Sequence, residues 1–134
     1  MVDWAVVLAP VMRDVTATCA VSLLVRYDQP PWLGEGPMIA TDPTSVVGMT
    51  GLAVENDLEV IDQTVAVASQ VASQVQDIAI EALWAAHRPL SWPECPHHRA
   101  SHPLEPVLAG IRAVWHCPVT RVVVADIGAL TAPS

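Results

Sequence analysis

The segment from Cys95 to Cys117 carries most of the residues that could do chemistry, since it holds two of the three cysteines and four of the five histidines. Zinc takes four ligands in a tetrahedral arrangement, commonly thiolate and imidazole. Cys95 and His98 have the knuckle spacing that lets two ligands from one turn reach one ion. A proline follows both Cys95 and Cys117 and helps to hold such turns. The pattern therefore predicts a metal site on this segment.

The choice between Cys117 and His116 follows from the predicted local structure. Residues 111–117 and 121–127 have the pattern of two strands joined by a short turn, which makes a C-terminal β-hairpin. Side chains alternate between the faces of a strand, so Cys117 shares a face with Trp115 while His116 points the other way. If Cys117 is a ligand, His116 is not expected to be one.

The fourth ligand is either His97 or His102. His97 is adjacent to His98, and two adjacent side chains seldom reach the same ion. His102 lies four residues beyond His98, and Pro103 places it in a loop rather than a helix. The predicted ligand set is Cys95, His98, His102 and Cys117.

Two thiolates and two neutral imidazoles would neutralise Zn²⁺ and fill all four positions, which is typical of a structural site. A catalytic site would need an open position and a general base; Glu94 or Glu105 could serve, but the spacing singles out neither. Two alternatives stay open. Cys95 and Cys117 could be reduced, buried thiols beside solvated histidines, or they could form a disulfide.

The first half of the chain must supply elements that support this segment. From Val11 onwards, apolar residues recur at helical spacing, which predicts a helix over about 11–26, although residues 20–25 could equally form a buried strand. Residues 28–37 are rich in Pro and Gly and predict a loop. Between 38 and 60, short β-prone runs separated by turn residues predict a small antiparallel meander with strands at 38–40, 45–47 and 52–54.

Residues 58–87 have the clearest helical pattern, with Asp57 or Asp62 as candidate caps. The helix has an alanine-rich apolar stripe that comprises Ala68, Val71, Ala72, Val75, Ile78, Ala79 and Ala82. Gln70, Ser73, Gln74, Asp77 and Glu81 lie on the other side. The stripe could pack on the chain's own sheet or dock a second subunit. We expect an α+β fold in which residues 1–90 form an assembly domain and residues 91–134 a Cys/His-containing hairpin appendage.

The composition argues for assembly over catalysis. Of the 134 residues, 52% are hydrophobic and only 15% are charged. The chain therefore has few polar side chains with which to cover the surface of an isolated monomer. Apolar surface that stays exposed tends to be an interface, which predicts a homo-oligomer or contacts with other structural proteins. The six basic residues are all Arg, so the chain has no Schiff-base or phosphate-loop lysine. A net charge of −8 also argues against general nucleic-acid binding.

The sequence gives little sign of export or membrane insertion. No apolar run approaches the ~20 residues of a membrane span. The first residues carry no positively charged region, and three cysteines do not make a secreted disulfide framework. We expect the chain in a virion or in the cytoplasm, and not secreted.

The C-terminal segment resembles that of small uncharacterised proteins of actinobacteria and their phages. Their pattern, WPxCPxHxxxHPL, then AVWxCP, then IGAL, corresponds here to residues 92–104, 113–118 and 127–130. The likeness covers roughly the last 60 residues and brings no catalytic residue with it. It implies a phage or prophage structural gene.

These observations favour three functions in decreasing order. The first is a non-enzymatic assembly subunit of a larger complex, such as a connector or tail component of a phage virion. The second is a zinc-ribbon-like adaptor that binds one protein partner in an actinobacterial host. The third is a metal hydrolase.

Overall fold

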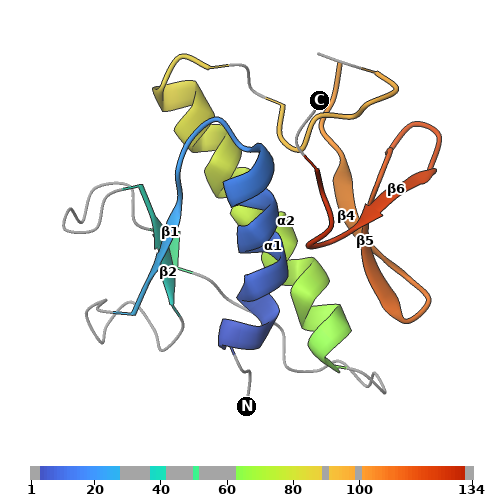
Figure 1. Cartoon of the computed structure of the whole chain (residues 1–134), viewed down its shortest axis with the longest axis horizontal. Coiled ribbons are helices and arrows are strands. Elements are labelled where there is room, and N and C mark those ends of the chain that lie inside the picture. Colours follow the sequence, from blue (N-terminus) through green and yellow to red (C-terminus); the bar gives the residue numbers. More distant parts are fainter. Residues whose placement is uncertain are drawn as a thin grey trace.

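The computed structural model describes residues 4–27, 37–41, 50–51, 63–88, 91–98 and 101–131. These residues form two helices and two three-stranded antiparallel sheets, so the fold is α+β, as predicted. In Figure 1 the two helices lie side by side between the sheets, with β1–β3 on one side and β4–β6 on the other.

Helix α1 spans Trp4–Thr18 and buries a stripe that includes Val7, Leu8, Val11 and Val15. The prediction of a helix over 11–26 was therefore wrong at both ends. Pro10 lies inside the helix and cannot donate a backbone hydrogen bond there. Burial of the apolar side chains on both sides of Pro10 offsets this loss, so the helix begins about two turns earlier than predicted.

The first sheet contains β1 (Leu24–Arg26), β2 (Met38–Ala40) and β3 (Thr50–Gly51), in that order. Strand β1 lies where the end of the N-terminal helix was predicted. A strand was the alternative that the sequence had left open for the apolar residues 20–25. Strand β2 confirms the predicted strand at 38–40, and all three of its residues are buried. The strands predicted at 45–47 and 52–54 lie outside the described residues.

Helix α2 spans Gln63–Ala85, within the predicted range of 58–87. It packs against α1, β4 and β5. The predicted apolar stripe is buried from Ala68 to Ala79, and Ala82 is half-buried against the same core. The stripe therefore packs on this chain's own elements. The candidate caps at Asp57 and Asp62 lie outside the described residues.

The second sheet contains β4 (Glu105–Ala109), β5 (Arg112–His116) and β6 (Val123–Asp126). Strands β5 and β6 are the predicted hairpin. Strand β4 was not predicted, since Pro106 lies within it; the sheet tolerates this proline because β4 is an edge strand.

One continuous core joins the helices to the C-terminal segment. Trp92 and Trp115 are buried in it edge to face, with ring centroids 5.6 Å apart. The core thus contains residues from both sides of residue 90. The division of the chain into an assembly domain (1–90) and an appendage (91–134) stays a prediction. Neither of the described helices is long and apolar enough to cross a membrane.

Candidate metal centre

The first half of the site is a turn that begins at Cys95. The backbone N–H of His98 donates to the carbonyl of Cys95 over 3.3 Å, which closes the turn and brings both side chains to the same side. Cys95 is fully buried, whereas His98 is partly exposed. An isolated β-bridge between Glu94 and Pro103 joins the start of this segment to the residues that follow His102.

The second half is the turn after β5. Cys117 is fully buried and donates its backbone N–H to the carbonyl of Val122 over 2.9 Å. The N–H of Arg121, whose φ is 64°, donates back to the carbonyl of Cys117 over 2.7 Å. The N–H of Thr120 donates to Sγ of Cys117 over 3.5 Å. The turn therefore presents Cys117 with a donor already directed at its sulfur, an arrangement that favours a thiolate.

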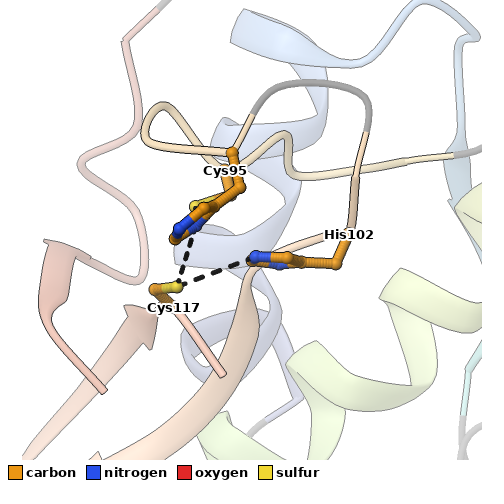
Figure 2. Close-up of side chains that lie close together, drawn as sticks. Cys95, His102 and Cys117 are labelled. Carbon is orange, nitrogen blue, oxygen red and sulfur yellow. Dashed lines mark hydrogen bonds between the residues drawn. The ribbon is translucent and has the colours of Figure 1, made fainter. Parts of the chain in front are cut away.

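The structure brings all four predicted ligands together. One donor atom from each of Cys95, His98, His102 and Cys117 lies within 4.8 Å of the other three. Figure 2 shows Cys95 and His102, from the segment between α2 and β4, and Cys117, at the end of β5, with their side chains directed toward a common point.

The individual distances fit a tetrahedral ion. Nδ1 of His98 lies 3.5 Å from Sγ of Cys95 and 3.4 Å from Sγ of Cys117, and Nε2 of His102 lies 3.8 Å from Sγ of Cys117. A tetrahedral zinc ion with bonds of about 2.3 Å to sulfur and 2.0–2.1 Å to nitrogen separates S and N ligands by about 3.5 Å. The donor set and its spacing therefore suit a metal ion such as zinc.

A backbone contact orients His102 for coordination. Its Nδ1 lies 3.0 Å from the carbonyl oxygen of Pro103. A carbonyl oxygen only accepts hydrogen bonds, so Nδ1 carries the proton and Nε2 keeps its lone pair. That lone pair is on the nitrogen nearest to Cys117. Such a hydrogen bond on the distal nitrogen is common among histidines that bind metals.

The pKa of Cys117 indicates how readily it supplies a thiolate. Burial acts to raise this pKa, but the Thr120 hydroxyl, the N–H groups of Thr120 and Val119 and the Cys95 thiol act to lower it, and the result is a pKa of about 6. Cys19 behaves in the opposite way, because burial raises the pKa of its thiol. Cys117 is therefore suited to metal binding, whereas Cys19 is half-buried against the core and its raised pKa makes it less reactive.

The remaining candidates lie outside the cluster. His97 is exposed, and His116 pairs with Glu105 at 3.2 Å on β4. Glu94 is exposed and, like Glu105, is not part of the group of four donors. All three cysteines are free, so the alternative of a disulfide between Cys95 and Cys117 is not what the structure shows.

Two polar residues that support the site were not predicted from the sequence. Gln76 on α2 is buried, and its Nε2 donates to the carbonyls of both Trp92 and Leu104. Asp14 on α1 is also fully buried and accepts a hydrogen bond from the indole of Trp115. The only signal for either was a polar residue on a helix face that is otherwise apolar.

Comparisons of the chain with protein-family models, with curated proteins and with solved structures found no match. The functional interpretation therefore rests on the geometry of the four side chains and their supports.

Proposed function

We propose that Cys95, His98, His102 and Cys117 hold one structural Zn²⁺ ion. The observation that carries this proposal is the convergence of four donor atoms within 4.8 Å. Two thiolates and two imidazoles fill a tetrahedral coordination shell and neutralise the ion, which leaves no position for a reactive water. The same donor set favours zinc over magnesium or calcium, which prefer oxygen ligands.

Zinc at this position would join the segment that precedes β4 to the end of β5, in addition to the pairing of Glu105 with His116. Cys95, His98 and His102 belong to the segment between α2 and β4, and Cys117 lies at the end of β5. The ion would thus fix the loop to the sheet. Because the unfolded chain has no such preformed site, the binding free energy of zinc adds to the stability of the fold.

A test of the metal site is metal analysis combined with alkylation of the thiols. We expect one zinc per chain, slow alkylation of Cys95 and Cys117 in the metal-bound protein, and faster alkylation of both once a chelator removes the metal. Cys117→Ser should lose the zinc, whereas the matched variant Cys19→Ser should keep it. The site would be refuted if the purified chain retained no zinc and if the chelator did not change the rate at which Cys95 and Cys117 are alkylated.

We also propose that the chain is a non-enzymatic subunit of a larger protein assembly. The turn that follows Cys117 supports this proposal, since Val119 and Val122 in it are 68% and 52% exposed, and Val123 at the start of β6 is 43% exposed. Exposed apolar side chains of this kind are ones that proteins use for contact with partners. A metal ion beside this turn would hold it rigid and so reduce the entropy lost on docking.

The likeness of the C-terminal segment to proteins of actinobacteria and their phages favours a phage particle as the assembly. Sedimentation of the full-length protein tests this, because a connector or tail subunit should form a closed oligomer or co-sediment with particle proteins. Val119→Thr combined with Val122→Thr should weaken that association. Ile111→Thr is the control, since Ile111 is 84% exposed in the β4–β5 turn at the other end of β5.

The outcome also separates assembly from the adaptor function. A monomer or dimer that binds one host protein would favour the adaptor and contradict a virion role. A monomer at high concentration with no retained partner would contradict both.

A further inference from the structure

We propose that Gln76 is a positioning residue of the metal site, which it controls without touching the ion. This inference rests on the proposed zinc site and concerns what sets its affinity. Gln76 lies on α2, 16 positions before Trp92 and 28 before Leu104, yet its side-chain amide donates to the carbonyls of both. The bond to the carbonyl of Trp92 is 3.1 Å long.

The two carbonyls mark the beginning and the end of the segment that carries three of the four ligands. Trp92 stands three residues before Cys95, and Leu104 stands two residues after His102. The ends are also joined directly, because the N–H of Leu104 donates to the carbonyl of Pro93 over 2.7 Å. One amide on a helix therefore fixes both ends of this closed loop to α2.

The chemistry of an amide suits this role. Its NH₂ group has two donors, so it can satisfy two carbonyls at once, and Gln76 is buried where water cannot easily replace it. An apolar side chain of similar size would remove both donors from these carbonyls and free the loop from this attachment to α2, while the backbone bond between Leu104 and Pro93 would remain. The ligands of the metal-free protein would then sample more conformations, and metal binding would have to order them again.

A purely structural role predicts a different result. If Gln76 stabilised the metal-free and the metal-bound protein equally, its loss would lower the stability of both and leave the zinc affinity unchanged. If it positions the loop, its loss weakens zinc binding as well. The zinc affinity therefore distinguishes the two roles, whereas stability alone does not.

The test compares Gln76→Met with Gln74→Met in the full chain. Gln74 lies on the same helix and donates within it, to the carbonyl of Gln70 over 3.3 Å, so its replacement is a matched control. Zinc affinity is measured by competition with a chromophoric chelator. We expect Gln76→Met to bind zinc about tenfold more weakly than the wild type, the effect that supporting residues of metal sites commonly have. Gln74→Met should bind it unchanged.

Gln76→Asn covers the case in which Gln76→Met does not fold, because it keeps the amide but withdraws it by one methylene. It should also weaken zinc binding. Wild-type affinity in a folded Gln76 variant would overturn this inference while leaving the zinc site intact. A wild-type chain that binds no zinc would instead refute the site itself.

Discussion

The indole Nε1 of Trp115 donates a hydrogen bond of 2.7 Å to the carboxylate of Asp14, although the two residues stand 101 positions apart in the chain. The same carboxylate accepts from the backbone N–H of Gly128 over 2.7 Å and from that of Leu130 over 3.0 Å. Asp14 is fully buried. One side chain of α1 thus holds both the centre of β5 and the segment that follows β6.

Replacement of Asp14 should therefore be costly. Asp14→Ala leaves three N–H donors without this acceptor, and one of them, the indole N–H of Trp115, is fully buried. We expect a loss of about 3–5 kcal/mol in the free energy of unfolding, measured by urea denaturation with zinc in excess.

Asp126 provides the control for this prediction. It pairs with Arg112, but both side chains are about half exposed. An exposed pair of this kind contributes at most about 1 kcal/mol, so Asp126→Ala should have a small effect. Equal losses from the two variants would contradict the central role given to Asp14.

Gly128 and Gly110 make a second matched pair. Both have positive φ, 103° and 63°, but only at Gly128 would an added Cβ meet another residue, since it would lie 2.9 Å from Cβ of Pro10 on α1. At Gly110 nothing lies within 4 Å. We expect Gly110→Ala to cost about 1 kcal/mol for its backbone conformation alone, and Gly128→Ala about 3 kcal/mol because the segment must also move away from α1.

Thermal unfolding of the two glycine variants measures the difference. If Gly128→Ala were no more destabilising than Gly110→Ala, the close packing of residues 127–130 on α1 would be wrong.

The sequence predicted correctly that Cys95, His98, His102 and Cys117 lie close together. Cys95 and His98 share one turn, and strand alternation predicted that His116 points away from Cys117; His116 pairs with Glu105. These arguments need only the rules of turns and strands. His102 was chosen over the exposed His97 by the same local reasoning.

Asp14 and Gln76 could not be placed in the same way. Their partners lie up to 116 and 28 positions away, and only the packing of helices on the C-terminal segment brings them together. The start of α1 was predicted wrongly for a related reason. Local rules disfavour Pro10 inside a helix, but tertiary burial of the neighbouring apolar side chains offsets the free energy that the lost backbone hydrogen bond costs. Long-range packing is what the sequence pattern leaves undetermined.

The stability of the metal-free protein should depend on pH through Cys117. Its folded-state pKa of about 6 is lowered from 9.0, the value expected in the unfolded chain. The unfolded state therefore binds more protons between these values, and stability rises with pH. This contribution is fully present above pH 9 and is lost as the pH falls toward 6.

Urea midpoints of the chelator-treated protein between pH 6 and 9 check this expectation. Cys117→Ser is the control, because it removes the titrating thiol and should flatten the dependence. A wild-type midpoint that is constant or falls with rising pH would contradict the assigned shift.

The account depends most on the zinc site, and the most direct test is the free energy of unfolding at buffered concentrations of free zinc. A single site that binds only the folded chain predicts a rise of about 1.4 kcal/mol for every tenfold increase in free zinc above the dissociation constant. Wild type and Cys19→Ser should both show this slope, and Cys117→Ser should not. A wild-type stability that is the same at every zinc concentration would contradict the account.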